Sequence, residues 1–231
     1  MKKENKKILV SITTTQKSDW RKKIEEVKEL GLDEVAAFPT CLNKKDREEF
    51  YKLIKESGIK NIPLVHLRSD MDIDEMDYFI ENYNTKVFCT HTQREYSFSH
   101  DLSKYHNIMG IENVYYSFDE EEIKKFGGIC LDFSHLENAK ISAREIFEHN
   151  VKTLEKYPVI ANHINSIKKT PHIDENGYSR YDNHFLNDLS EFDYLKNYPE
   201  NYFSPYIAIE LENSIKEQLK ARDYLNNLIN K

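Results

Sequence analysis

Nine side chains that carry an imidazole or a carboxylate close short apolar runs of this chain, or follow one in a long loop. Such groups are the usual protein ligands of divalent cations. Residues two apart in a strand share a face, and at six of these positions a small or apolar residue lies two places earlier, as Cys89 does before His91. This spacing predicts that the strand faces of a closed sheet end in metal ligands. The candidates are His66, His91, Glu112, Asp132, His135, His163, Asp182, His184 and Glu210.

Composition allows a plainer interpretation of any one candidate. The chain has 9 His and 40 Asp and Glu residues among 231, so a single polar residue near a strand end is most often a surface or hydrogen-bonded group. The recurrence at the ends of six strand-like runs favours a metal site. The net charge of -7 and the pI near 5.8 argue against a protein that coats nucleic acid through bulk positive charge.

The elements that would position these residues alternate between strand-like and helix-like segments. Eight such units across residues 1–231 predict a single-domain (β/α)8 TIM barrel with its site at the carboxyl ends of the strands. An open doubly wound sheet is the alternative, but no Gly-rich phosphate turn follows the first strand. The expected strands are residues 7–13, 33–39, 62–67, 86–91, 108–114, 128–135, 158–165 and 206–212. The expected helices are residues 18–31, 44–58, 72–84, 119–128, 142–158 and 214–231, with an irregular segment at 97–106 and a long loop with a short helix after residue 165.

Hydropathy and cysteine usage predict the compartment. No run approaches the roughly 18 apolar residues of a membrane span, and the Lys-rich start lacks a signal-peptide pattern. We therefore expect a cytoplasmic protein without a membrane partner. Cys41, Cys89 and Cys130 form no CxxC pair, and we expect all three to be buried thiols that form neither disulfides nor zinc sites.

The strand-end residues resemble those of the xylose isomerase-like TIM-barrel superfamily, and within it most closely those of the endonuclease IV family of apurinic/apyrimidinic endonucleases. Four stretches carry the resemblance: GIENV with Glu112, CLDFSH with Asp132 and His135, NHINSIKK with His163, and SRYDNHF with Asp182 and His184. Looser matches are VHL with His66, CTH with His91 and IELEN with Glu210. On the last strand Glu212 faces the same way as Glu210, and the resemblance favours Glu210.

The endonuclease resemblance implies up to three zinc ions, with manganese as an alternative metal. His66, His91 and Glu112 would hold the first ion, and Glu112 would bridge to a second held with Asp132, His163 and Glu210. His135, Asp182 and His184 would hold the third. Clustered divalent ions would then hydrolyse a phosphodiester, either in abasic DNA or in a smaller molecule, with Glu112 and Glu210 as the catalytic carboxylates.

The wider superfamily implies a different reaction. A sugar or sugar-phosphate isomerase or epimerase would need one ion, held by Glu112, Asp132, His163 and Glu210, with Glu112 and Glu210 moving a proton. A barrel used only for binding is a third possibility, which the unbroken ligand set disfavours. Shortened loops compared with the endonucleases weaken the case for DNA as the substrate. Four cations in or beside the predicted rim are candidates for substrate phosphate binding: Arg68, Arg94, Lys168 and Arg180.

Overall fold

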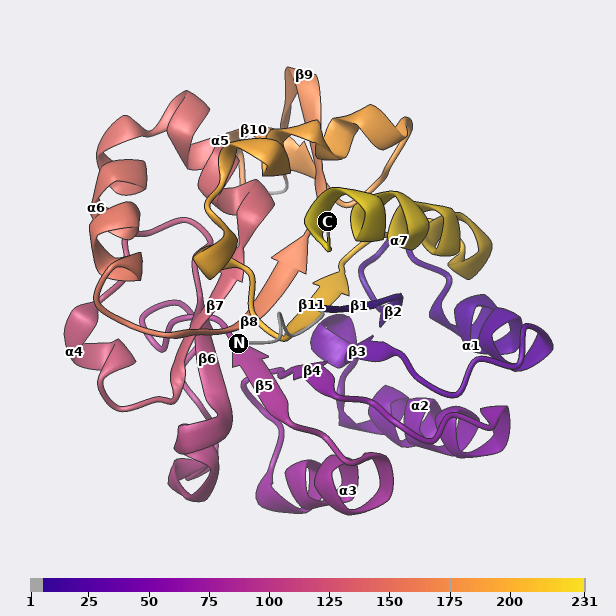
Figure 1. Cartoon of the computed structure of the whole chain (residues 1–231). Helices are drawn as coiled ribbons and strands as arrows, with labels where there is room; N and C mark the ends of the chain where they lie inside the picture. The colour runs from indigo at the N-terminus through magenta and orange to yellow at the C-terminus, as the bar shows by residue number, and fades with distance from the viewer. Residues whose placement is uncertain (1–5, 175, 231) are drawn as a thin grey trace.

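The barrel predicted from the sequence is confirmed by the strand order. The structure, a computed structural model, describes residues 6–174 and 176–230 (Figure 1). Its main sheet has the order β1-β11-β8-β7-β6-β5-β4-β3-β2, and every neighbouring pair is parallel. The strands are β1 (Lys7–Leu9), β2 (Ser11–Thr13), β3 (Ala36–Phe38), β4 (Leu64–His66), β5 (Val87–Thr90), β6 (Met109–Glu112), β7 (Gly128–Asp132), β8 (Val159–Ile164) and β11 (Tyr206–Ile209).

The sheet closes through the first extended segment of the chain. Its first half, β1, pairs with β11, and its second half, β2, pairs with β3. Val10 lies between the two halves and is fully buried. The segment that contains β1 and β2 therefore counts as one of the eight strand positions of the barrel. The carboxyl ends of all eight lie at one rim.

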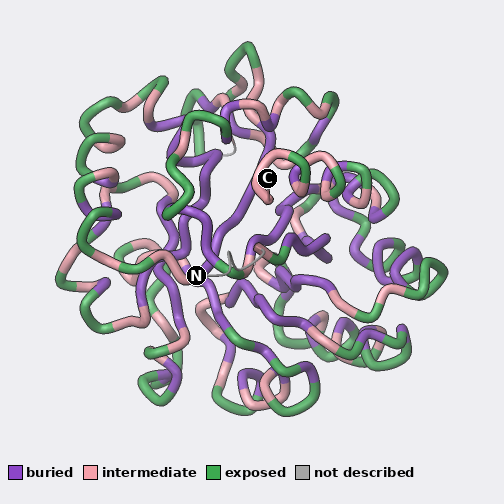
Figure 2. The backbone as a smooth tube through the Cα atoms, viewed as in Figure 1, coloured by how far each residue is buried: buried purple, intermediate pink, exposed green. Residues whose placement is uncertain are grey.

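Helices surround the barrel where apolar spacing predicted them. These are α1 (Trp20–Glu29), α2 (Lys44–Ser57), α3 (Ile73–Tyr83), α6 (Arg144–Leu154) and α7 (Ile215–Ile229). Polar side chains begin several of them, and Asp72 and Ser214 each form a capping box. Gly58 ends α2 in a left-handed conformation with φ of 91°. Figure 2 shows buried backbone along the strands and the inner faces of these helices, with exposed residues on their outer faces.

The second half of the barrel differs from the expected helices and loops. The segment expected as a strand to residue 135 leaves the strand at Asp132, and α5 (Phe133–Ser142) begins at once. The helix expected at 119–128 is the single turn α4 (Glu120–Ile123). The 3-10 helices η2 (Ser103–Ile108), η3 (Leu189–Asn197) and η4 (Glu200–Tyr202) lie in the connecting segments, and η1 (Pro39–Cys41) follows β3 in the first half. The expected long loop contains an antiparallel hairpin of β9 (Ser166–Ile173) and β10 (Ser179–Asn183).

Small residues fill the barrel interior beneath the rim. Cys89, Cys130, Ala161 and Ala208 are all fully buried there. The expectation of buried thiols holds for Cys89 and Cys130, but it was wrong for Cys41, which is exposed at the end of η1, outside the barrel strands. Over the described residues, no helix is long and apolar enough to cross a membrane.

Candidate metal centre

The barrel brings the strand-end candidates to one rim. His66, Glu112 and Asp132 are the last residues of β4, β6 and β7, and His163 is the last but one of β8. Asp132 lies opposite His163 in the register of β7 and β8. Because the strands are parallel, their carboxyl ends point the same way, and the side chains converge above the small interior residues.

Four of the candidates form the largest converging set in the described part of the chain. Donor atoms of Glu112, Asp132, His163 and Glu210 all lie within 4.8 Å of one another. His163 Nδ1 is 3.0 Å from Glu112 Oε1 and 3.6 Å from Glu210 Oε2. None of the four residues is more than 8% exposed. Three buried carboxylates at this separation repel one another, and a divalent cation among them would offset that repulsion. Three oxygen donors and one imidazole therefore fit a hard divalent ion.

Glu112 also faces two imidazoles besides that of His163, those of His66 and His91. His66 Nε2 is 2.7 Å from Glu112 Oε2, and His91 Nε2 is 3.4 Å from the same oxygen. The rings of His66 and His91 meet edge to face with centroids 4.9 Å apart. Glu112 thus presents one oxygen to His163 and the other to His66 and His91, which is the arrangement of a carboxylate that can bridge two positions.

Charge in the centre is set by its imidazoles. Burial opposes ionisation of Glu112, but His163 and His66 outweigh burial and hold the pKa of Glu112 well below its usual value. Burial, together with the nearby Glu112 and Glu210, raises the pKa of Asp132. Burial also opposes protonation of His135, yet Asp132 and Asp182 raise the pKa of His135 to about 9. The acidic neighbours of the buried His135 ring therefore favour its protonated form.

The residues expected to hold a third ion are arranged differently. Asp182 Oδ2 accepts from His135 Nδ1 at 2.7 Å, and both Asp182 oxygens accept from Arg180, at 2.6 and 2.8 Å. His184 lies apart, with Nδ1 3.8 Å from Glu210 Oε1 and without a hydrogen-bond partner. In the described part of the chain, no set of three or more donors within 4.8 Å includes His135, Asp182 or His184. Arg180 thus binds both oxygens of Asp182, the carboxylate that a third ion would need as a ligand.

Three residues that support the centre were missed from the sequence. Asn165 Nδ2 donates to Asp132 Oδ2 at 2.9 Å and to Glu210 Oε2 at 3.3 Å. Asn113 is hydrogen-bonded to the backbone N–H and C=O of Asp132. Ser134 Oγ donates to Asp132 Oδ1 at 2.6 Å. Each lies next to or within two positions of a predicted ligand, so proximity along the chain was the available signal.

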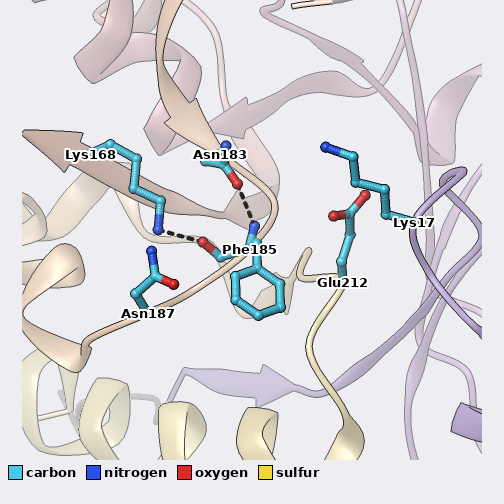
Figure 3. A pocket seen from close by; sticks show the side chains of 6 residues that line it. All are labelled: Lys17, Lys168, Asn183, Phe185, Asn187 and Glu212. Carbon is cyan, nitrogen blue, oxygen red and sulfur yellow. Dashed lines mark hydrogen bonds between the residues drawn. The ribbon is translucent and has the colours of Figure 1, made fainter. Parts of the chain in front are cut away.

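The last strand places Glu210 in the centre and Glu212 outside the converging set. Glu212 Oε1 accepts from Thr15 at 2.8 Å and lines a cavity of about 460 Å³ at the rim. Figure 3 shows Glu212 and Lys17 on one side of this cavity, with Phe185 and Lys168 on the other. Lys168 donates to Phe185 O at 2.5 Å and to Glu191 at 2.6 Å, so its charge already has an acidic partner.

The other rim cations have different surroundings. Arg68 is hydrogen-bonded to Asp70 at 3.1 Å and to Thr40 O at 3.2 Å. Arg180 is buried, paired with Asp182 as described, and stacked on the ring of Tyr115 at 4.8 Å. Arg94 lies over the Tyr116 ring at 4.4 Å. A second rim cavity of about 440 Å³ is lined by Arg94, Glu95, Tyr96, Tyr115, Tyr116, Asn176 and Tyr178.

This tyrosine-lined cavity adjoins the metal centre. The Tyr96 ring lies 5.3 Å from the ring of His91, centroid to centroid. Burial and the field of Glu112 raise the pKa of Glu95, which joins the same cavity wall. A molecule that reached the converging carboxylates from this side would therefore pass over aromatic faces and an arginine.

Comparisons with known proteins give remote structural likenesses. No protein-family model and no curated protein sequence matches the chain. The probable 3-DHS dehydratase AsbF involved in petrobactin synthesis from Bacillus anthracis has a TM-score of 0.47 at 10% identity, covering 96% of this chain and 98% of its own. A xylose isomerase domain protein from Planctomyces limnophilus has a TM-score of 0.46 at 12% identity, covering 96% of this chain and 94% of its own. An uncharacterized B. cereus protein scores 0.40 at 12% identity, with 97% and 65% covered.

Proposed function

We propose that this protein is a metal-dependent sugar or sugar-phosphate isomerase or epimerase with one divalent ion at its centre. The observation that carries the proposal is the convergence of Glu112, Asp132, His163 and Glu210, while Asp182 is engaged by Arg180. A four-residue centre suits a one-ion proton-transfer enzyme. The sequence also resembles the xylose isomerase-like superfamily, for which this residue set is the shared one.

Glu112 and Glu210 are the proposed proton carriers. They come from β6 and from the end of β11, and two other strands separate β6 and β11 in the sheet. Two carboxylates that approach from different strands can take a proton from one carbon and return it to the neighbouring carbon or to the opposite face. When bound, a divalent ion would polarise the substrate's oxygens and make the adjacent C–H bond more acidic.

The other residues would orient the substrate and the ligands. Asn165 fixes Asp132 and Glu210 relative to each other through its two hydrogen bonds. The tyrosine-lined cavity offers ring faces for a sugar, and Arg94 offers a cation for an attached phosphate. A polyhydroxylated substrate with or without a phosphate is therefore the class that we propose.

A phosphodiester hydrolase is the second candidate, favoured by the two-sided environment of Glu112. If His66, His91 and Glu112 held a second ion, Glu112 would bridge it to the first, as in clustered-metal hydrolysis. Abasic DNA or a smaller phosphodiester would then be the substrate. The engagement of Asp182 by Arg180 speaks against the complete three-ion arrangement.

One double variant separates the two candidates. Asp182→Asn with His184→Ala removes the charge and imidazole proposed for a third ion and leaves Glu112, Asp132, His163 and Glu210 in place. A one-ion isomerase should keep its ion and its deuterium exchange at the carbon next to an aldose carbonyl, measured by NMR in D2O. A three-ion hydrolase should lose about one ion per chain and most of its incision of an abasic duplex.

The carboxylates proposed to move the proton supply the positive control. Glu210→Gln keeps the shape of the side chain and removes its basicity, so proton exchange should fall by about 100- to 10,000-fold. If metal-replete wild-type protein exchanges no proton in any aldose, ketose or sugar phosphate tested and instead cleaves phosphodiesters, the isomerase proposal is wrong.

A further inference from the structure

A second group of donor atoms lies directly beneath the metal centre, inside the barrel. Cys89 Sγ, Cys130 Sγ and a ring nitrogen of His163 all lie within 4.8 Å of one another. Cys130 Sγ is 3.4 Å from His163 Nε2, whereas Nδ1 of the same ring faces Glu112 and Glu210. All three residues are fully buried. His163 therefore presents opposite nitrogens to two different sets of donors.

The barrel provides room for the two thiols to approach each other. Cys89 on β5 and Cys130 on β7 lie on either side of Gly110 on β6, and Cys89 is paired with Gly110 in the register. A Cβ at Gly110 would lie 2.8 Å from the backbone nitrogen of Cys130 and 3.2 Å from its Cβ. Because Gly110 has no Cβ, the backbone and Cβ of Cys130 can lie close to it inside the barrel.

The donor separations are those of a metal site that needs little adjustment. Bonds of about 2.3 Å to sulfur and about 2.0 Å to nitrogen separate two donors around one ion by roughly 3.5 to 4.0 Å. The observed 3.4 Å between Cys130 Sγ and His163 Nε2 is close to that range, and the 4.8 Å limit on the other pairs requires only side-chain rotation.

We propose that Cys89, Cys130 and His163 Nε2 form a site for a thiophilic ion that accepts three ligands, namely Cu(I). Thiolate sulfur selects soft ions such as Cu(I) over Mg(II) or Mn(II). Structural zinc sites are almost always four-coordinate, and among the described residues no fourth His, Cys, Asp or Glu joins this set. The surrounding interior side chains are apolar, Phe38, Leu64, Ala161 and Ala208 among them. A Cu(I) site is compatible with the expectation that these thiols form neither disulfides nor zinc sites.

The inference stands apart from the proposed reaction, although the two sites share His163. The hard donors Glu112, Asp132 and Glu210 lie on the Nδ1 side of the ring, and the soft donors lie on the Nε2 side. A neutral imidazole ligates through one nitrogen at a time, so each site is loaded and measured with the other site empty. Absence of isomerase activity would therefore leave the thiol site untouched, and absence of copper binding would leave the isomerase proposal untouched.

The test is anaerobic titration of reduced, metal-free protein with Cu(I) against a competing Cu(I) chelator, in which binding releases the two thiol protons to solvent. We expect one Cu(I) per chain and ultraviolet sulfur-to-copper charge-transfer absorption. Cys89→Ala and Cys130→Ala should each weaken Cu(I) binding by more than about 10-fold, because even an outer-sphere partner of a ligand contributes about 10- to 100-fold. Cys41→Ala, at the exposed cysteine, is the matched control and should bind as the wild type does.

Two further measurements test copper binding even if the ion enters the folded barrel slowly or the cysteine variants do not fold. Refolding the wild type in the presence of Cu(I) gives the ion access to the buried site if entry into the folded barrel is slow. X-ray absorption at the copper edge of the wild type should show two sulfur neighbours and one nitrogen, whether or not the variants fold. The proposal is overturned if neither route loads copper, if copper binding survives in the folded Cys89→Ala and Cys130→Ala variants, or if Cys41→Ala abolishes it.

Discussion

Two buried aspartates of the candidate centre differ in the charge of the groups that donate hydrogen bonds to them. Asp132 accepts hydrogen bonds from neutral donors, namely Ser134, Asn165 and the backbone N–H of His135. Asp182 instead accepts two hydrogen bonds from the Arg180 guanidinium. Neutral donors orient a carboxylate without cancelling its charge, whereas an arginine cancels it. The charge of Asp182 is therefore already offset by Arg180, whereas no arginine or lysine offsets that of Asp132 among its hydrogen-bond donors.

The sequence could identify the ligand types but not this pairing. Six of the candidates were found because strand parity relates each to a small or apolar residue two positions earlier. Arg180 and Asp182 also lie two apart, but their segment was expected to be a loop, where parity gives no information. In the structure they lie on β10, so their side chains share one face and meet.

The pairing of Arg180 with Asp182 predicts a large coupling between two substitutions. Asp182→Asn should lower the free energy of unfolding by about 3 to 5 kcal/mol, because it leaves a buried guanidinium without its counter-charge. Arg180→Met should cost a similar amount, and the double variant should recover much of the loss. Urea unfolding of the four proteins measures the cycle, and simple additivity of the two single effects would show that the ion pair is not formed.

At the scale of elements, the first half of the barrel follows its sequence pattern more closely than the second. Helices such as α1 and α2 have long amphipathic runs and polar caps, which local sequence reveals. The start of α5 was missed because Phe133 follows Asp132 as a further strand-like residue, and the side-chain cap of Asp132 on His135 N marks the change. The strands of the hairpin β9–β10 are mostly polar, so their sequence lacks the alternation of apolar and polar residues that marks a buried strand.

The packing of α1 on the barrel buries a lysine and predicts a pH dependence of stability. Lys23 Nζ donates to Thr13 Oγ1 at 2.7 Å and to Leu211 O at 2.6 Å. Burial lowers the pKa of Lys23 from 10.5 to about 7, although Glu212 and Glu26 oppose that shift. Between pH 7 and pH 10.5 the unfolded chain therefore binds more protons than the folded chain, and stability should rise with pH.

A matched variant isolates this contribution. Lys23→Met keeps the length of the side chain and removes the titrating group. Relative to this variant, the wild type should gain up to about 1.4 kcal/mol per pH unit above pH 7, and the difference should be constant at lower pH, where both states hold the proton. Chemical unfolding of both proteins across this pH range measures it. A difference that does not change with pH would mean that Lys23 stays charged in the folded chain.

At the scale of the whole molecule, closure of the sheet is what makes a centre from residues spread between positions 66 and 210. Alternating strands and helices predict parallel strands, and the carboxyl ends of parallel strands lie at one rim of the barrel. That much follows from the sequence. The distances between side chains at the rim do not, because they depend on the register of each strand and on rim segments such as β10.

Manganese binding by two Asp→Asn variants tests the one-ion centre most directly. In metal-free, reduced protein titrated with Mn(II), electron paramagnetic resonance should count one tightly bound ion per wild-type chain. Asp132→Asn should lose that ion, since it removes one of four converging ligands, and Asp182→Asn should retain it when measured below its unfolding temperature. Saturation of the wild type should also raise its stability by about 2.7 kcal/mol at 100 times the dissociation constant. Two or three tight ions per chain, or an ion kept by Asp132→Asn and lost by Asp182→Asn, would contradict a centre built from Glu112, Asp132, His163 and Glu210.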